Sequence, residues 1–233
     1  MGGIAGISIT SPLQLSGIAA WYRMDLLVTQ AGTVSAWGDS SGTGDANKNL
    51  AQATAGKRPT YTAADAAYNN QPTATYAAAS LQELDSAAWA AALTAPYTMF
   101  VVGNSDGAAT AQGLVGDPTN VVQFVLRNGG AGINIYAGAF LNAGMADSAS
   151  PKIWAAVVNG ASSTIYDSAK TAKATGNAGS NSLSRVFAGV DATGHYLNGK
   201  IAEIIVYSRA LSAAEINAVM NYCGSRYAIT VGS

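Results

Sequence analysis

Residues 197–229 constrain the fold of this chain more than any other segment. The run Ile201–Tyr207 is rich in β-branched and aromatic residues and follows the turn pair Asn198-Gly199, a pattern that predicts a buried or half-buried strand. Ser212 stands three residues before Glu215, and this spacing predicts a capping box at the start of a helix. An apolar stripe at helical spacing follows, made of Ile216, Val219, Met220, Cys223 and Tyr227. The segment therefore predicts one strand, one corner and one amphipathic helix.

The same segment closely resembles the C-terminal signature of laminin-G-type jelly rolls, which are concanavalin A-like domains common in bacterial and phage proteins. The matching residues are Gly199, Ile201, Ala202, Glu203, Tyr207, Arg209, Leu211, Ser212, Glu215 and Tyr222. Four earlier stretches resemble further strands and a loop of that family, at residues 15–25, 34–42, 70–76 and 96–102. The resemblance therefore covers residues 15–229 as an ordered set of motifs.

The resemblance implies an all-β fold, namely a concanavalin A-like antiparallel β-sandwich (jelly roll) with a short C-terminal helix. We expect residues 1–14 to form an extended N-terminal arm and residues 15–233 to form a single laminin-G-like jelly-roll domain. Short apolar runs between turn residues predict strands at 98–104, 121–127, 132–137, 152–159, 164–167 and 183–190. Residues 86–94 are Ala-rich and predict a short helix capped by Ser86 or Asp85.

The charge content of the chain is low. Charged residues make up 11% of it, against about a quarter in ordinary soluble proteins, and the net charge is −1. The sequence has no basic patch to bind nucleic acid and no run of Lys or Arg to suit an anionic membrane. We therefore expect neither nucleic acid nor membrane as a partner. Low charge favours contact with other protein surfaces, and we expect a homo-oligomer.

The lone cysteine and the N-terminus bear on where the chain is made. Cys223 has no partner for an intrachain disulfide, and its place on the helix stripe favours an apolar core group over a reactive thiol. The first twelve residues lack the Lys or Arg of a secretory signal, and no window approaches the ~18 apolar residues of a membrane span. We expect assembly in the cytoplasm, without a signal peptide or a transmembrane segment.

Most patterns that would indicate catalysis are absent from the sequence. His195 is the single histidine, in a Gly-rich turn, and a catalytic triad needs a nucleophile and an orienting group beside it. No cysteine pair or histidine cluster has the spacing of a zinc site. No Gly-rich loop ending in Lys-Ser or Lys-Thr is present to cradle phosphate.

Glycoside hydrolysis is the one enzymatic reaction that the resemblance raises, because the same superfamily includes glucanases with a Glu-x-Asp-x-x-Glu strand. Acids spaced along one strand share a face, as a nucleophile and an acid/base must. Glu83-Leu84-Asp85 begins this pattern, but Ala88 stands where the last Glu belongs. We interpret Glu83 and Asp85 as the lead-in to the helix over 86–94 and expect no enzymatic activity.

Calcium is the metal that the resemblance implies, at the rim of the sandwich. Asp39 and Asp45 share one loop, and Asp117 lies in another. Ca²⁺ takes about six to eight oxygen ligands, so clustered loop acids are candidates for it. The alternative is that these side chains cap their own backbone, as Asx residues in loops often do. We expect no other cofactor.

Aromatic residues are the candidates for glycan contact. The four tryptophans lie among apolar neighbours and are assigned to the core: Trp21, Trp37, Trp89 and Trp154. Five tyrosines lie in or near predicted loops, where an exposed ring can pack against a sugar: Tyr61, Tyr68, Tyr136, Tyr166 and Tyr196. Each of them is also a candidate for ordinary packing.

Three functions are consistent with these observations. The first is a non-catalytic virion structural protein of a phage or phage-like particle, as a head decoration, head spike or tail-fibre component. It would lie on the virion surface, contact other virion proteins, and recognise glycan on the host. The second is a stand-alone carbohydrate-binding module or adhesin, and the third is a glucanase-like glycoside hydrolase. Fold resemblance alone does not decide among them.

Overall fold

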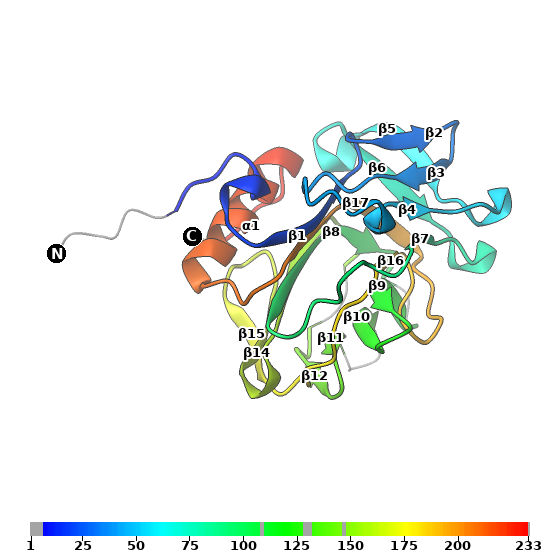
Figure 1. Cartoon of the computed structure of the whole chain (residues 1–233). Coiled ribbons are helices and arrows are strands. Elements are labelled where there is room, and N and C mark those ends of the chain that lie inside the picture. Colours follow the sequence, from blue (N-terminus) through cyan, green and yellow to red (C-terminus); the bar gives the residue numbers. More distant parts are fainter. Residues whose placement is uncertain (1–6, 108–109, 128–131, 146–147, 233) are drawn as a thin grey trace.

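The computed structural model describes residues 7–232 apart from 108–109, 128–131 and 146–147. Two antiparallel sheets pack face to face, and one α-helix, α1 (Ala213–Tyr227), lies against the outside of one of them (Figure 1). The predicted all-β sandwich with a short C-terminal helix is confirmed.

The first sheet, sheet A, is built around the predicted C-terminal strand β17 (Gly199–Tyr207). Its strands run in the order β15 (Ala172–Gly176), β14 (Ser163–Tyr166), β13 (Lys152–Val158), β8 (Tyr97–Ser105), β17, β6 (Gln71–Tyr76) and β5 (Thr60–Asp65). Strand β1 (Ile18–Arg23) also pairs with β17, along residues 203–207, whereas β6 pairs with residues 199–201. The register of β17 against β8 shifts between Ile201 and Glu203, at the point where the other partner of β17 changes from β6 to β1.

The second sheet, sheet B, is made of shorter strands. Their order is β12 (Phe140–Asn142), β11 (Gly132–Tyr136), β10 (Val122–Arg127), β9 (Gln112–Asp117), β16 (Phe187–Ala188), β7 (Leu84–Ser86), β4 (Leu50–Ala51), β3 (Val34–Trp37) and β2 (Val28–Gln30). Short 3₁₀ turns connect several strands: η1 (Pro12–Gln14), η2 (Ala46–Lys48), η3 (Ala55–Lys57), η4 (Ala66–Tyr68), η5 (Ala78–Ser80) and η6 (Gly160–Ser162).

The main core fills the space between the two sheets. Trp37, Leu84 and Phe124 reach into it from sheet B, and Trp154 and Ile204 from sheet A, all within 1% of full burial. The assignment of the four tryptophans to the core is confirmed, because each is at most 5% exposed. Close packing of large side chains from both inner faces is what holds a sandwich together.

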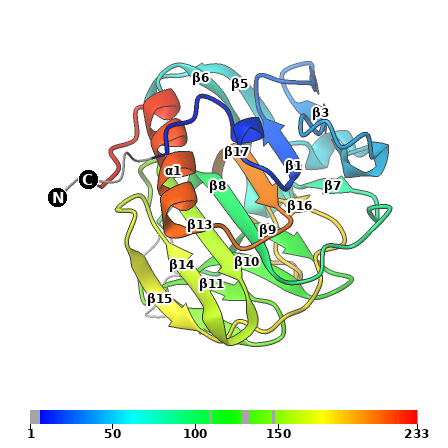
Figure 2. The ribbon, with the colours of Figure 1, turned by 60° about the vertical axis from the view of Figure 1, so that its left-hand side comes forward.

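A second core lies on the outer face of sheet A, under α1 (Figure 2). Phe100 and Ile205 contribute from the sheet, and Ile216 and Met220 contribute from the helix. Strands β8, β13 and β17 are therefore buried on both faces, which explains their nearly continuous apolar sequences. Cys223 is fully buried in this core, as the helix stripe predicts.

The predicted start of α1 is confirmed. The Ser212 hydroxyl accepts from the Glu215 backbone amide, and the Glu215 carboxylate accepts from the Ser212 amide at 2.9 Å. Arg209 also binds Glu215, at 2.6 Å, so the corner before the helix is fixed by three side chains. The guanidinium of Arg209, together with the Ser212 hydrogen bonds, lowers the pKa of Glu215 to about 2. The side chains of Arg209, Ser212 and Glu215 therefore stabilise the start of the helix.

Two local predictions are wrong, and both concern sheet B. Residues 86–94 are not a helix, because Ser86 ends strand β7 and the rest is irregular, held by backbone bonds from Trp89 and Leu93 to residues 183–184. The strand expected at 183–190 shrinks to β16, with isolated bridges at Leu183 and Val190 on either side of it. In both segments, pairing with distant strands overrides the local pattern.

The expected N-terminal arm falls partly outside the described residues. Pro12–Gln14, its last three residues, form the 3₁₀ turn η1 with a capping box between Ser11 and Gln14. The Tyr207 hydroxyl donates to the Pro12 carbonyl at 2.9 Å, so this turn is bonded to sheet A. Among the described residues, no helix is both long and apolar enough to cross a membrane.

Candidate functional site

Strands β7 and β16 present polar and aromatic side chains on the outer face of sheet B. Leu84 pairs with Ala188, and both side chains point into the main core. Side chains alternate along a strand, so Asp85 and its partner Phe187 point outward, and both are half-buried. The pairing of two short strands thus puts a carboxyl group and an aromatic ring side by side.

Arg185 joins this pair from the segment before β16. Val186 lies in the core, so Arg185 shares the outer face with Phe187, and its guanidinium lies 5.9 Å from the Phe187 ring centre. The Arg185 Nε atom is buried and has no hydrogen-bond partner in the structure. A buried donor without an acceptor is costly, so the hydrogen bonds of this guanidinium are not all satisfied within the fold.

Glu83, Lys57 and Tyr196 complete the group. Glu83 stands one residue before β7, and its Oε1 lies 3.2 Å from Nζ of Lys57, which ends the turn η3. Tyr196 comes from the loop after β16; burial raises the pKa of its hydroxyl, and the charges of Glu83, Lys57 and Asp85 act on it. We call these six residues the β7–β16 site: Lys57, Glu83, Asp85, Arg185, Phe187 and Tyr196.

Asp85 has the most perturbed carboxyl group of this site. Burial first, and then the charge of Glu83, raises its pKa to about 7, while Lys57 and Arg185 act in the opposite direction. Its Oδ1 atom is buried and has no hydrogen-bond partner. At neutral pH this carboxyl group is therefore divided between a protonated form that donates a hydrogen bond and an ionised form that accepts.

The loop at residues 191–196 lies across the same face of sheet B. A side chain at Gly116, the neighbour of Phe187 on β9, would lie within 2.6 Å of the Asp191 backbone, so glycine is required there. Asp191 holds the loop by accepting from the amides of Thr193 and His195. The loop therefore positions Tyr196 and packs against sheet B next to Phe187.

A second polar and aromatic group lies on strands β10, β11 and β12. Gln123 pairs with Tyr136, which pairs with Phe140, so the three side chains share the outer face. The Tyr136 and Phe140 ring centres are 4.7 Å apart, and Oε1 of Gln123 is buried without a partner. The outer face of sheet B thus carries half-buried or exposed aromatic rings at two places.

The structure separates the five tyrosines predicted to contact glycan. Tyr196 belongs to the β7–β16 site, and Tyr136 lies farther along the same face. Tyr61 packs against the main core, and Tyr166 packs against the core under α1. The assignment of Tyr68 is wrong, because it is 1% exposed and its ring is enclosed against Tyr227, 6.2 Å away.

The three aspartates predicted to bind calcium are not brought together. Asp39 and Asp45 line one shallow cavity with a volume of about 350 Å³. Asp117 is fully buried elsewhere and accepts from Thr119 and Ser184 at 2.6–2.9 Å. In the described part of the chain, no group of three or more His, Cys, Asp and Glu side chains is placed to hold a metal ion.

Both remaining aspartates act as caps, which is the alternative that the sequence left open. Asp39 accepts from the Trp21 amide at 2.8 Å and from the Ser41 hydroxyl at 2.6 Å. Asp45 accepts from the Asn47 amide and from the Ala90 amide, so it ties the loop to the segment after β7. Their oxygens are used to fix the backbone.

His195 has a partner that its sequence context did not indicate. Its Nδ1 lies 2.7 Å from Oδ2 of Asp191, which is buried, and 3.0 Å from the Thr193 hydroxyl. Both contacts fall on the same ring nitrogen and stay within one turn. They orient the loop and do not make the relay of a catalytic triad.

Comparisons with solved structures bear on the fold. No family model matches this chain, and no curated protein matches its sequence. Domain 4 of an extracellular family GH43 arabinanase from Geobacillus stearothermophilus, in complex with arabinotriose, has a TM-score of 0.60 at 14% identity. The match covers 89% of this chain and 98% of that domain.

Larger enzymes contain the same fold as a part. A GH54 α-L-arabinofuranosidase has a TM-score of 0.60 at 13% identity, and a Trypanosoma rangeli sialidase in complex with sialic acid has one of 0.52 at 10%. This chain is covered to 84% and 91%, but it spans only 51% and 33% of those proteins. At such identities the likeness shows a shared fold.

The expectation that the chain is not an enzyme is contradicted by these comparisons. The solved structures described above, which share this fold, are glycoside hydrolases or a domain of one. The expectation also relied on placing Glu83 and Asp85 before a helix. The structure places Asp85 on a strand and both carboxyl groups in one site.

Sequence reasoning missed Arg185, Phe187 and Lys57. The alternation of Arg185, Val186, Phe187 and Ala188 is a signal for a strand with one polar face, and applying it to the predicted strand would have marked Arg185 and Phe187. Lys57 carries no local signal, because only the fold brings η3 beside β7. Because a helix was wrongly predicted at 86–94, Asp85 was interpreted as part of the lead-in to that helix and not as a site residue.

Proposed function

We propose that this chain is a glycan-recognition domain and that the β7–β16 site is where it binds carbohydrate. The observation that carries the proposal is the grouping of two carboxyl groups, two cationic side chains and two aromatic rings on the outer face of sheet B. Aromatic rings pack against the apolar faces of sugars, and planar charged groups bind their hydroxyls. The unpartnered atoms of Asp85 and Arg185 supply an acceptor and a donor.

Binding is tested by calorimetric titration of a panel of oligosaccharides, beginning with arabinotriose. We expect saturable binding to one member of the panel, and Phe187→Ala to weaken it by roughly tenfold, since a stacked ring contributes on the order of 1 kcal/mol or more. Leu13→Ala is the matched control, because Leu13 is an exposed apolar side chain on the turn η1. Equal weakening by the two variants would contradict the proposed site.

Glycoside hydrolysis is a second candidate for the same site, and the raised pKa of Asp85 favours it. Glycosidases use two carboxyl groups with separated pKa values, one protonated to donate to the leaving oxygen and one ionised. Asp85 has a pKa of about 7, and Glu83 is paired with Lys57. Glu83 and Asp85 are alternate residues of one chain segment, so their carboxyl groups share a face, as the two carboxyl groups of a glycosidase must.

Hydrolysis is tested by the release of reducing ends from any oligosaccharide that binds. If the site is catalytic, Asp85→Asn and Glu83→Gln each lower the rate by roughly a hundredfold or more while binding persists. A bound oligosaccharide that stays intact under wild-type protein leaves recognition as the function and removes hydrolysis. A rate unchanged by both substitutions would locate the activity elsewhere.

We propose further that the domain is carried on the surface of a phage or phage-like particle, where it contacts other virion proteins and copies of itself. The resemblance of residues 15–229 to laminin-G-like domains of phage proteins and the 11% content of charged residues support this proposal. Light scattering after size exclusion tests self-association, and capsid or tail genes beside its gene test the virion assignment. A stable monomer encoded among metabolic genes would favour a stand-alone carbohydrate-binding module.

A further inference from the structure

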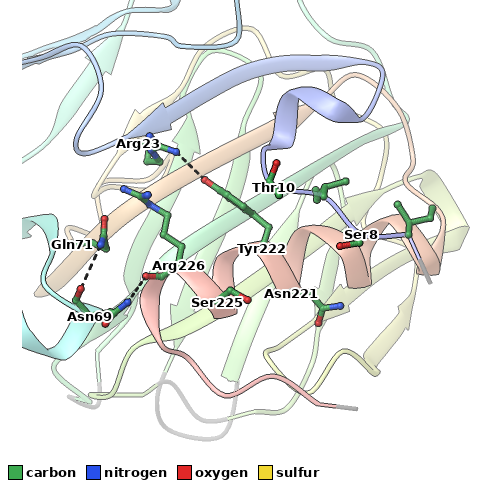
Figure 3. Close-up of a pocket in the computed structure, with 11 residues that line it drawn as sticks. Ser8, Thr10, Arg23, Asn69, Gln71, Asn221, Tyr222, Ser225 and Arg226 are labelled. Carbon is green, nitrogen blue, oxygen red and sulfur yellow. Dashed lines mark hydrogen bonds between the residues drawn. The ribbon is translucent and has the colours of Figure 1, made fainter. Parts of the chain in front are cut away.

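A groove runs between the described N-terminal segment and helix α1, on the side of the sandwich that faces away from the β7–β16 site. Its volume is about 730 Å³, which is within the range of small-molecule sites. Figure 3 shows the Arg226 side chain reaching from α1 toward Arg23 at the end of β1, with Asn69 and Gln71 beside them. Asn221 and Ser225 line the groove farther along the helix.

The two arginines are held in place by packed and buried groups. Arg23 binds Asp25 through Nε at 2.6 Å and Nη2 at 3.2 Å, and it lies 5.2 Å from the Trp21 ring centre. Its Nη1 donates to the hydroxyl of Tyr222 at 3.4 Å. That hydroxyl in turn donates to the buried carboxylate of Glu203 at 3.1 Å. A guanidinium fixed in this way loses little freedom when it binds a ligand.

Arg226 lines the groove and is held by a carboxylate and an aromatic ring. Its Nη2 donates to Asp25 at 2.8 Å, its guanidinium lies 5.5 Å from the Tyr227 ring centre, and its Nε is buried without a partner. Asp25 is shared by both arginines and lies outside the groove lining. The charged side chains that line the groove are therefore both cationic, and Asp25 binds both of them from outside the lining.

We propose that this groove is a second binding site and that it takes a carboxylate-bearing sugar, such as a uronic acid. A guanidinium binds a carboxylate through two parallel hydrogen bonds, which a neutral hydroxyl cannot match. Carboxamides of Asn69, Gln71 and Asn221 and the Ser225 hydroxyl are suited to the hydroxyls of the sugar ring. The site is separate from the β7–β16 site and does not rest on it.

The test is an NMR titration of the full chain with D-glucuronate, with D-glucose as the neutral counterpart and with inorganic phosphate as a bare oxyanion. We expect glucuronate to shift the backbone signals of residues 8–10 and 221–226, and glucose and phosphate to bind at least about tenfold more weakly. Glucose or phosphate binding as tightly as glucuronate would overturn the proposal. So would shifts confined to residues around Asp85, which would report the other site.

Substitutions make the test specific. Arg226→Gln is expected to weaken glucuronate binding by roughly tenfold or more, whereas Arg58→Gln, which removes an arginine bound to the carbonyls of Gln52 and Ala53, is expected to leave it unchanged. Asn221→Asp keeps the contact with Lys170 Nζ and adds a negative charge, so it should also weaken binding without unfolding the chain. Unchanged affinity in both groove variants, with unaltered melting curves, would overturn the proposal.

Discussion

The outer faces of the two sheets differ in how far they are covered. The outer face of sheet A is covered by α1, and its buried Glu203 accepts from Trp21 Nε1 at 2.5 Å and from the Tyr222 hydroxyl. The outer face of sheet B has no helix over it in the described residues, and it leaves polar atoms of Asp85, Arg185 and Gln123 without partners. Unpartnered polar atoms also occur beside the first face, at Glu203 Oε2 and Arg226 Nε, so the two faces differ mainly in that α1 covers the first and leaves the second open.

The core under α1 gives the largest expected effect on stability. Ile216→Ala is expected to lower the free energy of unfolding by about 2–5 kcal/mol, because it opens a cavity in a fully buried position. Urea denaturation measures the loss, and glycan affinity of the folded fraction should not change. Asn217→Ala, outside the buried stripe of the same helix, is expected to cost less than about 0.5 kcal/mol. Similar losses in both variants would mean that α1 is not packed as described.

A substitution of Arg185 tests whether the outer face of sheet B binds glycan. Arg185→Gln is expected to weaken glycan binding by roughly ten- to a hundredfold, because a charge-assisted hydrogen bond contributes about 1.5–3 kcal/mol. Its melting temperature should stay close to that of the wild type, since its Nε has no partner to lose. A large loss of stability with unchanged affinity would reverse the assignment of the two faces.

The helix cap gives a smaller effect on stability. Ser212→Ala is expected to cost about 1 kcal/mol, measured by urea denaturation, because it removes the acceptor for the Glu215 amide. Glu215 has a pKa of about 2 in the folded chain against an ordinary value of 4.5, so its contribution is present above about pH 4.5 and is lost as the pH falls toward 2. In Glu215→Gln this acid-dependent loss should shrink. A Ser212→Ala variant as stable as the wild type would show that the cap contributes nothing.

Asp85 gives a pH effect of the opposite sign. Its folded pKa of about 7 lies above the ordinary 3.8, so the folded chain binds the proton more tightly and stability falls as the pH rises from about 4 to 7. Asp85→Asn removes this fall, and at pH 8 it should be more stable than the wild type by on the order of 1 kcal/mol, after allowance for solvent screening. Thermal melts of both proteins from pH 4 to 8 measure the difference. Parallel curves would show that Asp85 is not perturbed.

The sequence predicted the well-packed half of the molecule better than the open half. Residues 197–229 carry local signals that agree with one another, and the structure confirms the strand, the cap and the buried Cys223. Around β7 and β16 the strands are two or three residues long, so local pattern is weak and distant pairing decides. That is why a helix was predicted at 86–94.

For the candidate site too, sequence pattern found some residues and only the fold could place the others. Tyr136 and Tyr196 were found as aromatic residues near loops, but the same criterion also selected Tyr68, which the packing against Tyr227 buries. Asp39 and Asp117 satisfied a loop-acid pattern, but each is used to bind backbone amides. A residue-type criterion cannot tell a free side chain from one that the fold has already engaged.

The sequence by itself determined the C-terminal strand, corner and helix and the burial of the tryptophans, because these follow from periodicity, capping and apolar neighbours within short segments. The sandwich was implied by the resemblance of residues 15–229 to laminin-G-like domains. The tertiary structure alone decided that Lys57, Glu83 and Asp85 meet Arg185 and Tyr196, and that Arg23 meets Arg226 across the groove. These residues are brought together by antiparallel pairing over long sequence separations. Such pairing is set by the balance of packing over the whole chain, which no local pattern carries.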